Sequence, residues 1–431
     1  MRTINLGLIG FGNVGSGLVK ILRDKKTFLA EKVGLEINIK KICDKDIVSK
    51  RNVSVPKQML TRDALELIND PQIDVIVELM GGLQPAKDYI TEALKKGKNI
   101  VTANKALLAQ YGQELFAEAA DRGKGIYFEA SVGAGIPIIK ALREGLVANR
   151  FHSIFGIVNG TSNYILSQMS RNNYTFGEAL SEARAKGFAE KDPALDIDGI
   201  DSAHKLILLT YLCFGRFVGL RDVFIEGISR ISLADVNYAS ELGFEIKLLA
   251  IAKKKDEDLE VRVHPTLIPK GHLLSSVDGI FNAIYVSSDL AGNLLFYGPG
   301  AGQSCAASSV VADLVDLIQD IKAGLFRPTL NIVPDKSIKR LCRIDDFQSR
   351  YYIRFMALDK PGVLAKVSGI LARLGISIAS VTQKERWRAQ VVPIVMVCHQ
   401  AKEKNLRAAL AMIGRLDAIK EKPVAIRIEE L

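Results

Sequence analysis

Ile4-Asn-Leu-Gly-Leu-Ile9 leads directly into Gly10-Phe11-Gly12-Asn13-Val14-Gly15, and Ser16-Gly-Leu-Val-Lys-Ile-Leu22 follows. The first segment has the composition of a buried strand, and the last has the spacing of a helix. The six residues between them read G-x-G-x-x-G. In this pattern the first glycine permits a tight turn, the second lets the backbone approach a pyrophosphate, and the third lets helix and strand pack closely. The free N–H groups of the helix start then face the phosphates. This order favours a dinucleotide-binding turn, with cofactor contacts from Gly10 through Gly15, over a purely structural glycine turn.

Residues 1–135 continue the alternation of strands and helices. The expected strands are Ile4–Ile9, Ile37–Cys43, Val75–Leu79, Asn99–Thr102 and Gly125–Glu129. Such alternation implies a parallel sheet with right-handed crossovers. We therefore predict a Rossmann-type doubly wound α/β domain over residues 1–135, to which a helix at about 306–325 returns.

The rest of the chain divides into three parts. Residues 136–305 mix helices with longer strands, which predicts an α+β domain. Residues 326–349 are polar and are expected to form a linker. Residues 350–431 have the order β-α-β-β-α-β, which is the ferredoxin-like arrangement.

Composition and charge narrow the class of protein. The 431 residues include 58 Lys and Arg and 48 Asp and Glu, a net charge of +10. Most of this charge lies in residues 350–431, where 15 basic residues face 7 acidic ones. Because no basic run is interleaved with aromatic residues, the pattern favours a solvated basic face or anionic ligands over a nucleic-acid partner. Five scattered cysteines, the lack of a secretory leader and the lack of a long apolar run predict a cytoplasmic protein with no membrane partner.

The choice of dinucleotide stays open. An acidic residue after the second strand binds the ribose hydroxyls of NAD, whereas a basic residue there accepts the extra phosphate of NADP. The sequence supplies Asp44 and then Lys45, with Arg51 and Lys57 nearby. The basic cluster slightly favours NADP, whose extra phosphate Lys45 would accept. A solvated loop explains each of these side chains equally well.

Two polar segments follow expected strands. Thr102-Ala-Asn-Lys105 lies at the carboxyl end of a parallel strand, where ligands of doubly wound folds bind. Lys105 there suits a carboxylate, a phosphate or the nicotinamide edge, and it suits an ordinary helix start as well. Asn159-Gly-Thr161-Ser-Asn163 offers hydroxyl and backbone donors to a substrate, although Ser162 or Asn163 also fits a helix N-cap.

A third segment combines acids with a lysine ahead of an apolar helix. It runs from Glu190 through Asp196 and Asp201 to Lys205. Asp201 and Lys205 are four residues apart and share one helical face. Burial would lower the pKa of the lysine and the carboxylate would oppose that shift, so the two form a candidate acid–base pair. A capped helix with a surface ion pair is the alternative.

Metal sites built from side chains are not indicated. The glycine of the acidic segment falls at the wrong position for a calcium loop, and Ile200 occupies its third acidic position. The five histidines lack zinc-ligand spacing. Proton transfer in a dehydrogenase of this sequence would therefore use a side chain or water, and lysine is the best-placed side chain.

Taken together, these segments resemble the homoserine dehydrogenase family in the version with a C-terminal ACT domain. The resemblance covers essentially the whole chain. It is carried by GLIGFGNVG, TANKALL (Thr102–Leu108), FEASVGAGIPII (Phe128–Ile139), VNGTSNYIL (Val158–Leu166), DIDGIDSAHKL (Asp196–Leu206) and GPGAG (Gly298–Gly302). The family interconverts L-homoserine and L-aspartate 4-semialdehyde with NAD(P), a step towards threonine and methionine. The resemblance makes residues 136–305 the substrate and dimerisation domain.

The resemblance also implies roles for individual residues. Lys205 would donate a proton to the aldehyde oxygen, or remove it in reverse, and Asp201 would orient that lysine. Glu190 and Asp196 would hold the substrate amino group, with Asn159 and Thr161 also in the substrate site. Lys105 would lie between cofactor and substrate, and Thr102 and Gly302 would lie near the cofactor.

A monovalent cation, Na⁺ or K⁺, is a further implication of the resemblance. Its ligands would be mostly backbone carbonyls at Glu129, Val132, Ala134 and Ile136, and its role would be structural. The sequence departs from the family after GPGAG, where Cys305-Ala-Ala-Ser308 replaces the usual Pro-Thr-Ala-Ser. This departure puts the local helix start near the cofactor in doubt.

The ACT domain implies feedback by an amino acid, with threonine the first expectation and a purely dimerising role the alternative. We expect a homodimer or homotetramer.

Two other functions are alternatives to this one. One is a 2-hydroxy-acid dehydrogenase, which usually needs an Arg and a His where this chain offers Asp and Lys. The other is a non-catalytic amino-acid sensor, against which intact Glu190, Asp201 and Lys205 argue.

Overall fold

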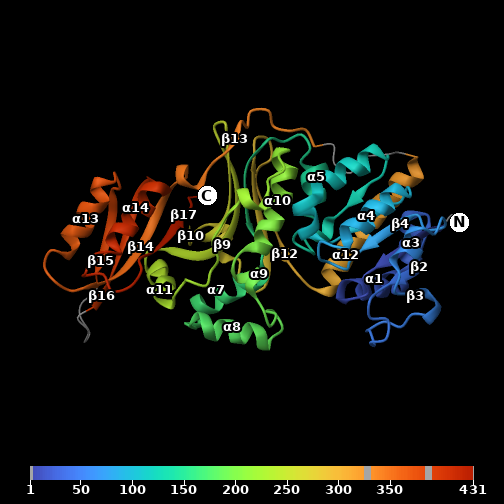
Figure 1. The fold of residues 1–431 in the computed structure, drawn as a ribbon, viewed down its shortest axis with the longest axis horizontal. Coiled ribbons are helices and arrows are strands. Elements are labelled where there is room, and N and C mark those ends of the chain that lie inside the picture. The colour runs from blue at the N-terminus through green and yellow to red at the C-terminus, as the bar shows by residue number, and fades with distance from the viewer. Residues whose placement is uncertain (1–2, 325–331, 384–390, 431) are drawn as a thin grey trace. The chain divides into compact units, whose positions relative to one another are not determined.

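The computed structural model describes residues 3–324, 332–383 and 391–430 (Figure 1). The chain forms two compact units. The first unit comprises residues 1–154, 203–221 and 281–335, and the second comprises residues 155–202, 222–280 and 336–431. Among the described residues no helix is both long enough and apolar enough to cross a membrane.

A six-stranded parallel sheet forms the centre of the first unit. Its strand order is β3-β2-β1-β4-β5-β6. The strands are β1 (Thr3–Ile9), β2 (Glu36–Cys43), β3 (Leu60–Thr61), β4 (Val75–Glu78), β5 (Asn99–Thr102) and β6 (Ile126–Tyr127). This is the order of doubly wound dinucleotide-binding sheets, in which the strand order changes direction between the parallel strands β1 and β4. The predicted Rossmann-type α/β architecture is confirmed.

Helices cover the faces of this sheet because their apolar stripes need a partner to be buried. They are α1 (Asn13–Asp24), α2 (Lys26–Val33), α3 (Ala64–Ile68), α4 (Ala86–Lys95), α5 (Lys105–Asp121) and α12 (Gln303–Ala323). Figure 1 shows α12, drawn in orange, beside the blue α1, although nearly 300 residues separate them in sequence. Gly17 permits this approach, since a Cβ there would lie 2.7 Å from Gln303 Cγ.

The expected strand Gly125–Glu129 is shorter in the structure. Only Ile126–Tyr127 pairs with β5, and Glu129–Ser131 forms a 3₁₀ turn. The reason is a long-range contact: the Glu129 carboxylate accepts hydrogen bonds from the backbone of Ile139 and Lys140, both at 2.8 Å. The first unit also contains α6 (Ile138–Lys140), a π-helical turn over Ala141–Gly145, and the hairpin of β11 (Phe281–Ser288) and β12 (Gly292–Pro299).

Long antiparallel strands organise the second unit. β9 (Phe244–Lys255) and β10 (Asp258–Pro269) pair along their whole length. Around them lie α7 (Gly160–Asn172), α8 (Phe176–Ala185), α9 (Ala194–Ile197), β8 (Phe224–Ile225) and α11 (Leu233–Glu241). β7 (Phe151–Ile157) and α10 (Ile200–Phe214) each begin in one unit and end in the other.

The last part of the chain has the predicted ferredoxin-like order. Its elements are β14 (Gln348–Leu358), α13 (Val363–Arg373), β15 (Ile378–Gln383), β16 (Val391–Lys402), α14 (Glu403–Ile413) and β17 (Val424–Ile428). β17 pairs on one side with β14 and on the other with β10, so this fold continues the sheet of the second unit. Of the expected linker 326–349, residues 326–331 lie outside the described residues, and the remainder contains the short strand β13 (Arg340–Leu341), which pairs with β10.

Candidate active site

The predicted nucleotide loop joins β1 to α1 with the geometry that its glycines imply. Gly10 has φ of +102°, and a Cβ there would lie 2.5 Å from the carbonyl carbon of Leu79. A Cβ on Gly15 would lie 2.1 Å from the Gly10 oxygen, so this helix and strand pack too closely for a side chain. At Gly12, by contrast, no described atom lies within 4 Å of a built Cβ. No side chain caps α1 either, so its first N–H groups border open space, as an anion site requires.

The acidic and basic residues after β2 are arranged around Phe11. Asp44 accepts a hydrogen bond from Phe11 N at 2.5 Å. Arg51 donates through Nε to the Phe11 oxygen at 2.8 Å, and its guanidinium lies 5.9 Å from the centre of the Phe11 ring. Arg51 therefore braces the loop, whereas Lys45 has an exposed side chain at the end of β2.

Thr102 and its neighbours form a buried polar network at the carboxyl ends of β4 and β5. Thr102 Oγ1 donates to Glu78 Oε2 at 2.6 Å, and Asn104 caps α5 by accepting from Leu107 N at 3.2 Å. Lys105, half-buried, is the first residue of that helix. Burial raises the pKa of Glu78, which also accepts from the backbone of Met80 and Gly81.

The segment Glu129–Ile136, predicted to hold a cation, is a tight turn packed on α12. Ala134 has a positive φ of +36°, and its carbonyl accepts a hydrogen bond from the Ser309 hydroxyl. The Ile136 oxygen accepts from Ile138 N at 2.7 Å, and the Glu129 oxygen from Val132 N at 3.5 Å. A carbonyl oxygen has two lone pairs, so one hydrogen bond leaves room for a cation. These residues are thus compatible with a carbonyl-lined cation site.

Two buried carboxyls lie beside this turn. Burial raises the pKa of Glu129 to about 7. Burial also raises the pKa of Asp313 well above its ordinary value, and the charge of Glu129 adds to the shift. Asp313 accepts from Glu129 N at 2.8 Å, which ties the turn to α12.

The glycine turn Gly298–Gly302 closes against β11. A Cβ on Gly300 would lie 2.0 Å from the Asn282 side chain, and Gly302 has φ of +126° at the N-cap of α12. The helix starts regularly after it, since Ala306 N donates to the Gly302 oxygen at 3.0 Å. Cys305, half-buried, therefore sits in an undistorted first turn.

In the second unit the structure brings together two of the predicted substrate residues, Asn159 and Asp196, and the predicted catalytic residue Asp201. Asn159 Nδ2 donates to Asp196 Oδ1 at 2.7 Å and to Asp201 Oδ2 at 2.9 Å. Asn159 Oδ1 accepts from Ser162 N at 2.8 Å and so caps α7. The helix cap is therefore Asn159 and not Ser162 or Asn163, the two residues that the sequence allowed for it, and the same amide also bridges two carboxylates.

The other predicted substrate residues of this unit differ in exposure. Thr161 uses its hydroxyl to donate to the Phe188 oxygen at 2.7 Å, which anchors the segment after α8. Glu190, two residues further on, differs from Thr161 in that its side chain is exposed.

Asp201 and Lys205 lie one turn apart on α10, as the spacing predicts. Both are buried, with exposed fractions of 9% and 8%. A lysine is rarely this buried without a polar partner. The surface ion pair that the sequence also allowed is therefore wrong, because neither residue lies on the surface.

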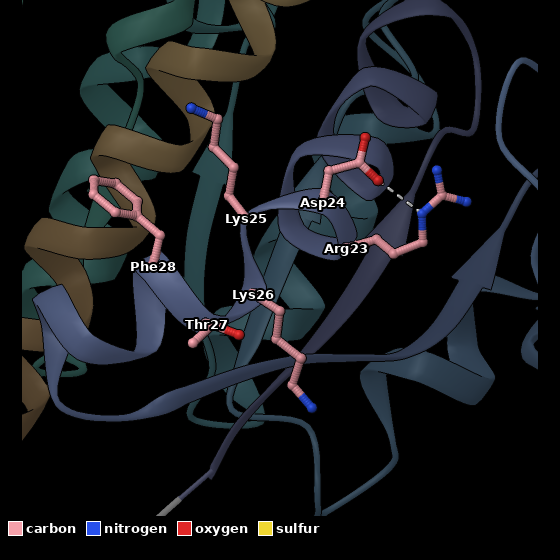
Figure 2. A pocket seen from close by; sticks show the side chains of 6 residues that line it. All are labelled: Arg23, Asp24, Lys25, Lys26, Thr27 and Phe28. Carbon is pink, nitrogen blue, oxygen red and sulfur yellow. Dashed lines mark hydrogen bonds and ion pairs between the residues drawn. The ribbon is translucent and has the colours of Figure 1, made fainter.

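The hollow in Figure 2 lies where α1 meets α2 and is lined by six consecutive residues, Arg23–Phe28. Arg23 Nε donates to Asp24 at 3.0 Å, and the exposed Phe28 ring lies 5.8 Å from Lys25 Nζ. None of the predicted site residues lines this hollow, whose volume is about 370 Å³.

Comparison with known families agrees with this geometry. A family model described as homoserine dehydrogenase matches residues 137–315, and one described as its NAD-binding domain matches residues 10–129. An ACT-domain model matches residues 351–414. A homoserine dehydrogenase from Neisseria gonorrhoeae is 42% identical over 435 residues, with both chains covered completely. The chain belongs to the homoserine dehydrogenase family.

Solved homoserine dehydrogenases have the same fold. A structure of the enzyme from Thiobacillus denitrificans superposes with a TM-score of 0.91 at 42% identity, covering 100% of this chain and 99% of that one. A hyperthermophilic archaeal homoserine dehydrogenase, solved with NADPH, matches with a TM-score of 0.64 at 27% identity, covering 76% of this chain and all of that one. The predicted oxidoreductase class, NAD-binding domain and ACT domain are thereby confirmed.

Sequence reasoning missed some residues of this homoserine dehydrogenase site. Glu78 lies inside the expected strand Val75–Leu79 and was not singled out, although an acid near the carboxyl end of a buried parallel strand is a recognisable signal. Asp313 carried no such signal, because its contact with Glu129 joins positions 184 residues apart. Within the described residues, no cluster of three or more His, Cys, Asp or Glu side chains is arranged to hold a metal ion.

Proposed function

We propose that this chain interconverts L-homoserine and L-aspartate 4-semialdehyde with NAD(P), using Lys205 as the acid and base. The observation that carries the proposal is the buried pair of Asp201 and Lys205 on one face of α10, with Asp201 tethered to Asp196 through Asn159. A buried ammonium beside a fixed carboxylate is suited to proton transfer.

In the reductive direction the aldehyde carbon gains a hydride and the carbonyl π bond breaks. Bound reduced nicotinamide supplies that hydride. The Lys205 ammonium gives its proton to the carbonyl oxygen, which becomes the hydroxyl of homoserine, and the neutral amine is reprotonated from solvent. In the oxidative direction Lys205 takes the hydroxyl proton. General acid–base catalysis of this kind is worth about 10²–10⁴-fold in rate.

The carboxylates would serve binding and orientation. Asp201 orients Lys205 and the reacting hydroxyl, and Asp196 holds the cationic amino group of the substrate. The bridging amide of Asn159 supports this division, because it fixes both carboxylates before substrate arrives. Glu190 is exposed and would reach the amino group only when substrate is bound, with Thr161 fixing the neighbouring segment.

Lys105 and Thr102 would lie on the cofactor side of the reaction, together with Gly10–Gly15 and Gly302. For the choice of dinucleotide we favour NADP over NAD. Lys45 supports this, because its side chain is exposed after β2, while Arg51 is committed to the loop backbone. The related archaeal enzyme was solved with NADPH. Asp44 still offers carboxylate oxygens to a ribose hydroxyl, so NAD is the second candidate.

A monovalent cation, Na⁺ or K⁺, would bind the carbonyls of Glu129, Val132, Ala134 and Ile136 in a structural role. The positive φ of Ala134, which turns the chain sharply at this point, supports the proposal. A nearby cation would also favour the ionised form of Glu129, whose pKa burial raises to about 7.

The ACT domain supports regulation by an amino acid, threonine first. The reaction would then stand in threonine and methionine biosynthesis, in a cytoplasmic homodimer or homotetramer. An ACT domain that only dimerises is the alternative, and threonine inhibition of turnover tests the difference.

The test of the activity is absorbance of the reduced nicotinamide with homoserine and either NADP or NAD. We expect cofactor reduction with homoserine and none with simple 2-hydroxy acids. Turnover of a 2-hydroxy acid instead would identify the competing dehydrogenase class. No turnover with any substrate, in protein that still binds cofactor, would identify a sensor.

A further inference from the structure

A large cavity in the second unit is lined by none of the predicted site residues. Its volume is about 1290 Å³, and it lies where α14, β17 and the segment between them meet residues 224–231. All its lining residues belong to the second unit. We call it the basic cavity. Cavities for drug-sized ligands usually measure about 300–1,000 Å³, so this one has room for a nucleotide-sized molecule.

The lining is strongly cationic. Seven basic residues line it against three acidic ones, Glu226, Glu403 and Glu421. The basic residues are Arg230, Arg354, Arg407, Arg415, Lys420, Lys422 and Arg427. A cavity whose walls carry mostly one sign of charge raises the local concentration of ions of the opposite charge.

The basic residues fall into two groups. In the first group, Arg427 bonds to Glu403 at 2.6 Å and to Glu226 at 2.9 Å, Arg354 bonds to Asp235 at 2.6 Å, and Arg407 bonds to Glu403 at 3.2 Å, so these side chains are held in ion pairs. The second group is Arg230, Arg415, Lys420 and Lys422, which are exposed and make no ion pair with any part of the chain that the structure describes. Uncompensated positive charge therefore remains around the opening.

Aromatic and aliphatic side chains add an apolar wall. The centre of the Phe224 ring lies 4.6 Å from the guanidinium group of Arg427 and 5.5 Å from that of Arg407. Leu406 and Ile419, both buried, line the same space. A ligand with anionic groups and a planar or apolar body would match both features.

We propose that the basic cavity binds a small metabolite that carries two or more negative charges, on phosphate or carboxylate groups, next to a planar or apolar body. Hydrogen bonds between guanidinium or ammonium groups and such anions are among the stronger ones in proteins. The unpaired cations supply them without breaking an existing ion pair.

One wall of the basic cavity contacts the segment that follows Asp196, a predicted substrate residue. Ile228 N donates to the Ile197 oxygen at 2.8 Å, one residue after Asp196. At Gly227 a Cβ would lie 2.3 Å from the Ile197 oxygen and 2.6 Å from Asp198 Cα, so the backbones of the two segments are packed against each other. Because of this contact, we expect an anion bound in the basic cavity to change the KM for homoserine. This expectation rests on the function proposed above.

The first experiment measures binding and does not depend on activity. The full chain, saturated with NADP so that the nucleotide loop is filled, is titrated calorimetrically with inorganic tripolyphosphate and, separately, with citrate. The test variant is Arg415→Glu/Lys420→Glu, and the control is Lys366→Glu/Arg373→Glu on α13, which makes the same charge change outside the cavity. We expect the test variant to bind at least about tenfold more weakly than wild type, and the control to bind within about twofold.

The two anions distinguish the ligand chemistry. If only tripolyphosphate binds, the ligand is phosphorylated. If only citrate binds, the ligand is a polycarboxylate. If both anions bind, the site selects for negative charge. The proposal is overturned if neither anion binds wild type, or if the test variant binds as wild type does. It is also overturned if light scattering shows that the test variant, unlike the control, dissociates into smaller species, because the cavity would then be a contact between copies of the chain. A binding site that leaves the KM for homoserine unchanged would contradict the coupling to Asp196.

Discussion

Replacing Asn159 separates two roles that one side chain performs. Asn159→Ser keeps an oxygen that can cap α7 but removes the amide that bridges Asp196 and Asp201, whereas Asn159→Ala removes both. A hydrogen bond to a charged group contributes about 1.5–3 kcal/mol, and the lower end applies to the half-exposed Asp196. Loss of the bonds to both carboxylates in the serine variant should therefore lower the free energy of unfolding by about 3–4.5 kcal/mol. The alanine variant should lose about 1 kcal/mol more through the cap.

The assay is urea unfolding followed by circular dichroism, with the shift in midpoint multiplied by a common slope. Thr175→Ala on α8 is the matched control, because it removes an exposed helix cap with no carboxylate bridge. It should lower stability by only about 1 kcal/mol. If Asn159→Ser were as stable as wild type, or lost no more than the control, the bridge would not hold the two carboxylates, and the reasoning about the substrate site would be refuted.

Three further predictions follow from the first and second units. Gly12→Ala should leave the melting temperature unchanged but raise the KM for the dinucleotide at least about tenfold, because the added methyl group would meet only the pyrophosphate. Gly15→Ala should lower the melting temperature, because its Cβ would overlap the Gly10 oxygen. A normal KM for the dinucleotide in Gly12→Ala would contradict the assignment of this loop to the cofactor. Burial raises the pKa of Glu129 from 4.5 to about 7, so the folded state binds this proton more tightly than the unfolded state. The free energy of unfolding should therefore fall as pH rises from about 4.5 to 7, by no more than about 3 kcal/mol. Glu129→Gln should flatten the plot of melting temperature against pH in this range, and an unchanged slope in that variant would contradict the prediction. Arg262→Met should lower the free energy of unfolding by about 3–5 kcal/mol, because it leaves the buried Glu260 without this ion pair and leaves Glu429 with only Lys253, 3.8 Å away. A small loss in urea unfolding would mean that water reaches these two carboxylates.

Local patterns in the sequence were sufficient for much of the fold. The strand, glycine loop and helix at Ile4–Leu22 are encoded by neighbours in the chain, so the doubly wound sheet could be predicted. The spacing of Asp201 and Lys205 likewise needed only the helical period. The ferredoxin-like order of residues 350–431 followed from the same kind of evidence.

Contacts between distant residues could not be predicted. The pairing of β17 with β10 joins Arg427 to Thr266, and nothing in either strand specifies that partner. Arg51 belonged to the basic cluster that slightly favoured NADP, with a solvated loop as the alternative, and only the structure shows that it is bonded to the Phe11 oxygen, 40 residues away. The Glu129 carboxylate shortened a strand in the same way, by accepting amides from a later turn.

The most direct test of the proposed mechanism is turnover by Lys205→Met. Methionine fills much of the same buried volume but cannot carry a proton, so the substitution removes the chemistry with little change in packing. We expect kcat for homoserine oxidation to fall by about 10²–10⁴-fold, while NADP affinity stays within about twofold. Lys95→Met, an exposed lysine on α4, should leave both unchanged. Near-normal kcat in Lys205→Met would contradict the account, because the proton would then come from another group.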